Sequence, residues 1–253
     1  MRKMRVRVVS VLLLIILLLT GCNGWKNYIH TESSLKREAA DALEEKYNEE
    51  FTIHKVWIKN QTTFYATCSP EDEQDIVFEA QVYKDGSGIY KDEYIQGAVS
   101  KQMEEKLQPK MEEVFGECFV KVTFTFVGQA CDYYEGVTIE EYYKLYEDVY
   151  PYIQIFVNME GQDYSKEESM QEFEILSQLY DMEYIEGAGC RCYFLNKESM
   201  SACREYFKED SCERGGSEVF ENLQYFGFGF NEGVINKTFE EYDEVRKEIN
   251  TNE

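Results

Sequence analysis

Seven cysteines downstream of the N-terminal segment are the residues of this sequence best suited to chemistry. They are Cys68, Cys118, Cys131, Cys190, Cys192, Cys203 and Cys212. The C-x-C spacing of Cys190 and Cys192 differs from the C-x₂-C spacing of structural zinc sites. Within a strand, both thiols would point to the same side of the sheet. The spacing leaves open a redox or nucleophilic role for this pair, beside a structural one.

Other groups that catalyse reactions are scarce or undistinguished. The only histidines are His30 and His54, and a Ser–His–acid arrangement would need His54, which has no nucleophile elbow near it. Acidic residues are so frequent that no pair stands out as general acid and base. Residues 85–87 with Asp92 lack the ligand spacing of known calcium loops. The sequence therefore predicts no catalytic residue, no metal site and no cofactor, and we expect the protein not to be an enzyme.

Tyrosines are concentrated in one stretch of the chain. They are Tyr133, Tyr134, Tyr142, Tyr143, Tyr146, Tyr150 and Tyr152. Exposed aromatic side chains stack on sugars or bind peptides. However, Tyr142 and Tyr146 are four residues apart, which is ordinary spacing for the buried face of a helix. We expect most of these rings to pack in the core.

The N-terminus has the three parts of an export signal. Met1 to Arg7 is basic, and Val8 to Leu19 is apolar except for Ser10. This apolar run is shorter than the ~20 residues that a membrane-spanning helix needs. It is followed by Leu19-Thr20-Gly21-Cys22.

Leu19-Thr20-Gly21-Cys22 resembles the lipobox of bacterial lipoproteins. The resemblance implies that the Cys22 thiol receives diacylglycerol, that a peptidase cleaves before this residue, and that acyl chains hold the protein on the extracytoplasmic face of the cell membrane. The alternative is an uncleaved helix over residues 6–21, with Cys22 incidental. The resemblance covers only the first 22 residues and assigns the remainder to no characterised lipoprotein family.

Export bears on the other cysteines. An extracytoplasmic protein meets oxidising conditions, so we expect disulfides among them. Their number, seven, is odd, which leaves at least one thiol free or paired with another chain.

The charge of the chain limits its partners. The formal net charge is −23, from 26 basic and 49 acidic residues. Cleavage before Cys22 would remove four basic residues and leave −27. Such a protein is repelled by phosphate backbones and anionic lipid headgroups. We expect no nucleic acid partner and membrane contact only through the anchor, with an envelope protein or a cationic ligand as candidate partners.

Hydrophobic periodicity predicts a helix, three strands and a second helix in the first half. Residues 35–47 have helical spacing behind a cap at Ser33 or Ser34. Strands are expected at 51–58, with a slip in the alternation after Ile53, and at 63–67 and 76–83. A turn at 85–88 leads to a helix from Asp92 to Gln108, which Pro109 ends.

The second half alternates strands with capped helices. Strands are expected at 119–127, 152–157, 189–195 and 223–230. Capping boxes are formed by Thr138 with Glu141, Ser165 with Glu168, and Thr238 with Glu241.

The sequence as a whole predicts an α+β fold, with antiparallel or mixed sheets and packed helices. We divide it into a signal peptide (1–21), a lipidated tether (22–32), an αβββα subdomain (33–112) and a strand-helix subdomain (117–250). The expected function is a non-enzymatic binding or structural role at the cell envelope. The alternative is a thiol-dependent enzyme or redox protein that uses Cys190 and Cys192.

Overall fold

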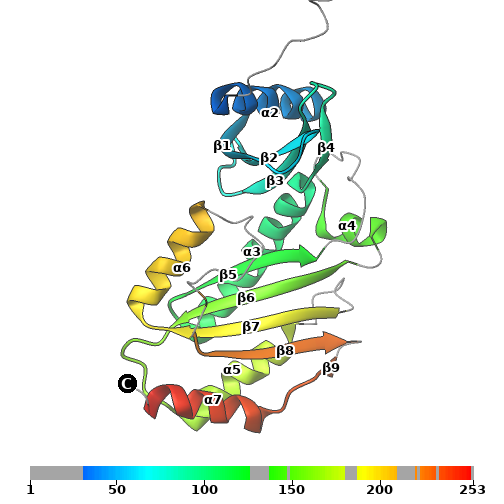
Figure 1. The fold of residues 1–253 in the computed structure, drawn as a ribbon. Helices are drawn as coiled ribbons and strands as arrows, with labels where there is room; N and C mark the ends of the chain where they lie inside the picture. The colour runs from blue at the N-terminus through cyan, green and yellow to red at the C-terminus, as the bar shows by residue number, and fades with distance from the viewer. Residues whose placement is uncertain are drawn as a thin grey trace, which may run out of the picture.

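The structure, a computed structural model, contains two sheets packed with helices (Figure 1). It describes residues 31–125, 137–146, 149–179, 187–209, 220, 223–231 and 234–251. One sheet has four strands and the other has five. The predicted α+β class is confirmed.

The first sheet is an antiparallel meander in the order β1-β2-β3-β4. Its strands are β1 (Phe51–Ile58), β2 (Thr63–Pro70), β3 (Phe78–Tyr83) and β4 (Ile89–Asp92). Helix α2 (Glu32–Tyr47) covers one face with buried side chains at every fourth position, namely Leu35, Ala39, Leu43 and Tyr47. The predicted slip in β1 is confirmed by a register shift between Ile53 and Lys55.

Two predictions at the ends of these elements are wrong. The helix cap is Thr31, whose hydroxyl accepts a hydrogen bond from the Ser34 N–H, and not Ser33 or Ser34. The sequence also predicts three strands in this half, whereas the structure has a fourth, β4. Asp92, the expected start of the second helix, is the last residue of that strand. Its carboxylate binds the Lys46 ammonium and the Tyr47 hydroxyl, so contacts distant in sequence decide its position.

Helix α3 (Tyr94–Phe115) connects the two sheets and is longer than predicted. It runs through Pro109, which removes one backbone hydrogen bond. Burial on one side of the helix continues past this residue, at every fourth position: Ile95, Val99, Met103, Leu107, Met111 and Phe115. Tertiary packing therefore outweighs the local effect of the proline. The helix ends at Gly116, whose φ of 68° favours glycine.

The second sheet has the order β5-β6-β7-β8-β9 and is mixed. Its strands are β5 (Cys118–Thr125), β6 (Tyr150–Asn158), β7 (Gly187–Leu195), β8 (Tyr225–Asn231) and β9 (Val234–Ile235). Strands β6 and β7 are parallel, and the other neighbouring strands are antiparallel. The intervening helices are α4 (Ile139–Leu145), α5 (Lys166–Ser177), α6 (Lys197–Glu209) and α7 (Phe239–Thr251).

Helices cover the two faces of this sheet unequally. On one face, α3, α5 and α7 enclose the largest apolar core, to which β7 contributes Cys190 and Cys192. On the other face, α6 contacts β6 and β7, and a smaller cluster forms around Phe156 and Tyr193. Figure 1 shows α6 beside the end of β7 and α3 passing across the opposite side of the sheet.

The predicted helix starts are confirmed. Thr138 and Glu141 form a reciprocal capping box at α4, and Thr238 and Glu241 exchange the same hydrogen bonds before α7. At α5 the Ser165 hydroxyl accepts from the Glu168 N–H, but the Glu168 side chain does not return the bond, so the predicted capping box is only half formed there. Caps depend on residues three apart, which is why the sequence alone predicts them.

Within the described parts of the chain, every helix is too short or too polar to cross a lipid bilayer.

Candidate functional site

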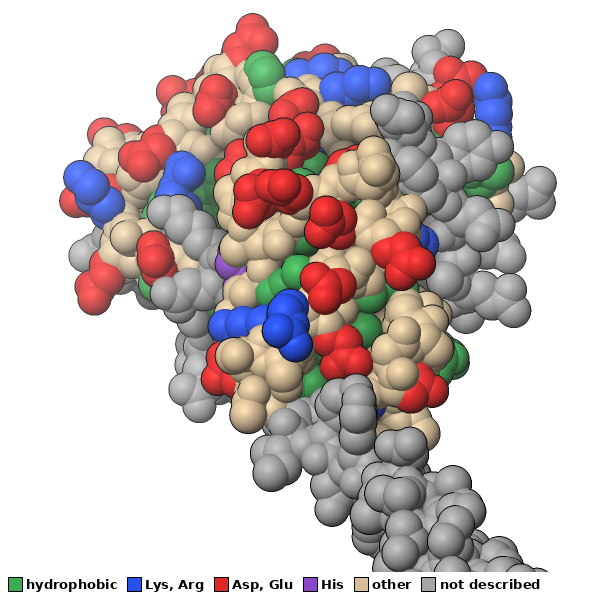
Figure 2. All heavy atoms as spheres, turned by 90° about the horizontal axis from the view of Figure 1, so that it is seen from above, with side chains coloured by type: hydrophobic (Ala, Val, Ile, Leu, Met, Phe, Trp, Pro, Cys, Tyr) green, Lys and Arg blue, Asp and Glu red, His purple; other side chains and the backbone are tan. Residues whose placement is uncertain are grey.

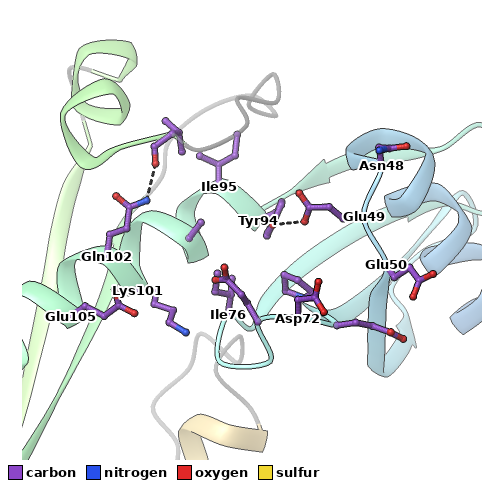
Figure 3. Close-up of a pocket in the computed structure, with 15 residues that line it drawn as sticks. Asn48, Glu49, Glu50, Asp72, Ile76, Tyr94, Ile95, Lys101, Gln102 and Glu105 are labelled. Atoms are coloured by element: carbon purple, nitrogen blue, oxygen red, sulfur yellow. Dashed lines mark hydrogen bonds between the residues drawn. The ribbon is translucent and has the colours of Figure 1, made fainter.

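A cleft lies where the first sheet meets α3 (Figure 3). Its volume is about 800 Å³. The walls come from the α2–β1 corner (Asn48 to Glu50), the β2–β3 connection (Pro70 to Ile76) and α3 (Tyr94 to Glu105). Segments far apart in sequence therefore form this one concave surface.

The floor of the cleft is apolar. It includes Ile76, Ile95, Ala98 and Val137. Gly97 allows the β2–β3 connection to approach α3 closely, since a Cβ there would lie 3.0 Å from Cγ2 of Ile76. The Gln102 amide donates to the Val137 carbonyl at 2.7 Å and so connects α3 to the segment that carries Val137.

The rim of the cleft is strongly acidic. Six carboxylates line it, and the only basic side chain among the lining residues is Lys101. The carboxylates belong to Glu49, Glu50, Glu71, Asp72, Glu73 and Glu105. Figure 3 shows Glu50 and Asp72 on one side, with Lys101, Gln102 and Glu105 on the other. Lys101 is 3.2 Å from the exposed carboxylate of Asp75, so this pair neutralises little of the rim.

Carboxylates crowd each other at one point of the rim. A hydrogen bond to Glu50, together with its negative charge, raises the pKa of Glu71 above its usual value. Two carboxyl groups that share a proton would ionise more easily next to a cation. Glu49 is held by the Tyr94 hydroxyl at 2.7 Å. The rim is thus suited to bind positive charge.

The acidity extends beyond the cleft. Figure 2 shows Asp and Glu side chains spread over the face seen from above, at the end of the molecule that carries α2. However, no group of three His, Cys, Asp or Glu side chains among the described residues is arranged to hold a metal ion.

The thiols that the sequence singled out lie away from the cleft. Cys190 and Cys192 are both in β7 and both face the core against α3, α5 and α7, so the prediction that they share a side is confirmed. They are 2% and 0% exposed. Burial raises the pKa of both thiols well above the ordinary value. A nucleophilic thiol needs the opposite environment, which argues against a nucleophilic role for Cys190 and Cys192.

The disulfide expectation is wrong for the cysteines that the structure describes. None of the described cysteines forms a disulfide, and all of them are buried: Cys68, Cys118, Cys190, Cys192 and Cys203. They fill space in the apolar clusters as small hydrophobic side chains do. Cys131 and Cys212 lie outside the described residues.

We predict that Cys190 and Cys192 resist alkylation in the folded protein. Near neutral pH, iodoacetamide should modify them at least about tenfold more slowly than in the urea-unfolded chain, because the reaction needs an opening of the sheet. Peptide mass spectrometry over a time course measures both rates. Rapid modification of the folded protein would instead favour the thiol-dependent alternative.

His54 has a serine neighbour but not the geometry of a catalytic pair. Its Nε2 lies 2.7 Å from the Ser69 hydroxyl, which donates its proton to Gln74 at 3.0 Å. The Ser69 side chain is fully buried and has no access to a substrate. Burial and the charge of Lys36 lower the pKa of His54. This interaction joins β1 and β2 and serves packing.

The tyrosines of the tyrosine-rich stretch differ in how far they are buried. Tyr142 is fully buried beside Phe124 and Tyr146, as helical spacing predicts. Tyr150 is 51% exposed on β6. Tyr133 and Tyr134 lie outside the described residues, as do His30 and the predicted lipidation site Cys22. The cleft itself was not predicted, because its residues come from four segments that no spacing rule connects.

Comparison with known proteins supports the fold and goes no further. No family model matches this chain, and no curated protein matches it. A crystal structure of a DUF5037 family protein from Ruminococcus gnavus ATCC 29149 is similar, with a TM-score of 0.66 over 84% of this chain and 99% of that one. The two sequences are 16% identical. At 16% identity, this similarity shows that the chain shares the fold of the Ruminococcus gnavus protein, and it shows nothing about function.

Proposed function

We propose that this protein is a lipid-anchored, non-enzymatic binding protein of the cell envelope that takes up an organic cation in the acidic cleft. The observation that carries the proposal is the rim of six carboxylates and one ammonium over an apolar floor. Polyamines and lysine-rich peptides combine several charges with methylene chains, which match such a rim and floor. The raised pKa of Glu71 adds to the case, because a bound cation would relieve its repulsion with Glu50.

The cleft is tested by calorimetric titration with spermine. We expect the wild-type protein to bind spermine, and the Glu50→Gln/Glu71→Gln variant to bind roughly tenfold more weakly, a difference of ~1.4 kcal/mol. The matched control is Glu167→Gln/Glu198→Gln, which removes the same charge from the starts of α5 and α6. Equal weakening in both variants would mean that the affinity for spermine depends only on the net charge of the protein. That result would contradict binding in the cleft.

The affinity should also depend on pH in one direction. As the pH falls through the raised pKa of Glu71, its carboxylate takes up a proton beside Glu50 and loses the negative charge that would attract a cation. Spermine binding should therefore weaken at a higher pH than the usual glutamate value predicts. In the Glu50→Gln variant the cause of the shift is gone, so the weakening should move to lower pH.

The anchor is tested separately. Metabolic labelling with a fatty acid should mark the wild-type protein and should leave the Cys22→Ala variant unlabelled, because only a thiol accepts the diacylglyceryl group. Cys68→Ala is the control, since that thiol is buried in the first sheet. An unlabelled wild-type protein with residues 1–21 still attached would contradict the lipoprotein assignment and leave the cleft result unaffected.

A further inference from the structure

The second sheet has a partly open face. Alternation along β6 and β7 places Tyr152, Gln154 and Arg191 on the same face as Phe156 and Tyr193. Helix α6 packs over Phe156 and Tyr193. The neighbouring part of this face is accessible: Tyr150 and Tyr225 are 51% and 45% exposed, and Arg191 is exposed. We call Tyr150, Tyr152, Arg191 and Tyr225 the tyrosine–arginine platform.

Glycines hold the rings of the platform flat against the sheet. A Cβ at Gly189 would lie 3.0 Å from Cδ2 of Tyr152. One at Gly187 would lie 3.1 Å from both Cδ1 and Cε1 of Tyr150, and one at Gly227 would lie 3.2 Å from Cε2 of Tyr225. Each tyrosine ring thus lies over a glycine, where the strand has no side chain. Larger residues at these three glycine positions would lift the rings away from the backbone.

A guanidinium group is held between two of the rings. The Cζ atom of Arg191 lies 4.7 Å from the ring centre of Tyr225 and 5.6 Å from that of Tyr152. Its Nη1 donates to the Tyr193 hydroxyl at 3.4 Å. Although the chain has 49 acidic residues, no carboxylate among the described residues pairs with Arg191. An exposed arginine fixed by aromatic contacts and without a counter-ion is suited to receive an anion.

The remaining surroundings fit a sugar better than other anions. Gln154 lies opposite Arg191 in the register of β6 and β7 and adds amide donors and an acceptor. The platform extends over three adjacent strands, roughly 10 Å, which is long enough for a disaccharide segment. Tyr150 and Tyr225 are each about half exposed, and the accessible parts of their rings would contact pyranose rings.

We propose that the tyrosine–arginine platform binds an acidic glycan, with pyranose rings on the tyrosines and a sugar carboxylate on the Arg191 guanidinium. This second binding surface lies on another sheet from the acidic cleft and attracts the opposite charge. The proposal does not depend on the cleft, and the two are tested with different ligands.

The experiment titrates the full-length protein with an oligogalacturonate, a chain of uronic acids, and with a maltooligosaccharide as its neutral counterpart. At about 0.15 M ionic strength the Debye length is about 8 Å, so distant carboxylates are screened. We expect the oligogalacturonate to bind the wild-type protein more tightly than the neutral chain does. Arg191→Gln and Tyr225→Ala should each weaken this binding at least about tenfold, and Tyr225→Phe should retain it because the ring remains.

Matched controls come from other parts of the surface. Tyr90→Ala removes a tyrosine that is 53% exposed on β4, and Arg37→Gln removes an exposed arginine of α2; both should bind within twofold of wild type. The Glu50→Gln/Glu71→Gln variant should keep its affinity for oligogalacturonate. The proposal is overturned if wild-type protein does not bind oligogalacturonate, if the controls lose as much as the platform variants, or if Arg191→Gln binds normally. Thermal unfolding of each variant verifies its fold, and Arg191→Gln keeps the test decisive if Tyr225→Ala does not fold.

Discussion

Replacing Arg246 by Met should cost about 3–5 kcal/mol of folding stability, because it leaves the buried carboxylate of Glu172 without its cation. The side chains of Arg246 and Glu172 are 2% and 5% exposed, between α7 and α5. Arg246 donates from Nε at 2.7 Å and from Nη2 at 3.0 Å, a bidentate arrangement. The Tyr242 hydroxyl also donates to Glu172, at 2.6 Å. In the Arg246→Met variant, the charged Glu172 carboxylate would therefore remain buried with the Tyr242 hydroxyl as its single partner.

Urea unfolding of a small set of variants measures this effect. Glu172→Met should be similarly damaging, since it leaves the guanidinium unpaired. The triple variant Arg246→Met/Glu172→Met/Tyr242→Phe removes every polar member at once and should regain most of the stability. Lys144→Met is the control on α4, where both members of the pair with Glu140 are exposed and the pair contributes little. Losses of the same size for Arg246→Met and Lys144→Met would contradict the structure.

Truncating Leu107 to Ala should cost about 2–5 kcal/mol and should destabilise both sheets together. Leu107 is fully buried in the core between α3 and the second sheet. The same helix contributes Tyr94 and Ala98 to the core of the first sheet. A cavity beneath α3 would therefore weaken the element that both cores use. This expectation bears on the predicted subdomains 33–112 and 117–250, which meet at the end of that helix.

Two probes follow the two sheets in one denaturant titration. Trp57 stacks on Tyr65 in the first sheet at 5.6 Å and reports its unfolding by fluorescence, with Trp25 replaced by Phe. Pulsed alkylation of Cys190 and Cys192 reports the second sheet. Both transitions should shift together in Leu107→Ala, and neither should shift in Leu145→Ala, whose side chain is 50% exposed on α4. A shift of the alkylation transition alone would mean that the halves unfold independently.

Local features of the chain were predictable because they depend on neighbouring residues. The capping box at Thr138 and the apolar spacing of α2 follow from contacts three and four residues apart. Strand β1 was predicted with its bounds and its register shift. Errors arose where distant contacts outweigh the local pattern, as at Pro109 within α3 and at Asp92 in β4.

The candidate sites were less predictable than the elements. The sequence directed attention to Cys190 and Cys192, which the structure buries in the core. The acidic cleft was foreseen only as a negative charge suited to cations, without a position. The tyrosine–arginine platform left a signal in the sequence, since Gly187, Gly189, Gly227 and Gly229 alternate within two strands. The role of Gly187 and Gly189 becomes evident only when β6 places the rings of Tyr150 and Tyr152 over them.

The sequence by itself determined most of the helical and extended segments, the sign of the net charge, and an N-terminal signal that predicts export and a lipid anchor. Tertiary structure decided the parallel placement of β7 beside β6, the burial of the thiols, the Glu172–Arg246 pair and both candidate binding surfaces. The physical reason is distance along the chain. Backbone preferences and caps act within a few residues, whereas a cleft, a buried ion pair or a stacked guanidinium depends on which distant side chains share the same space.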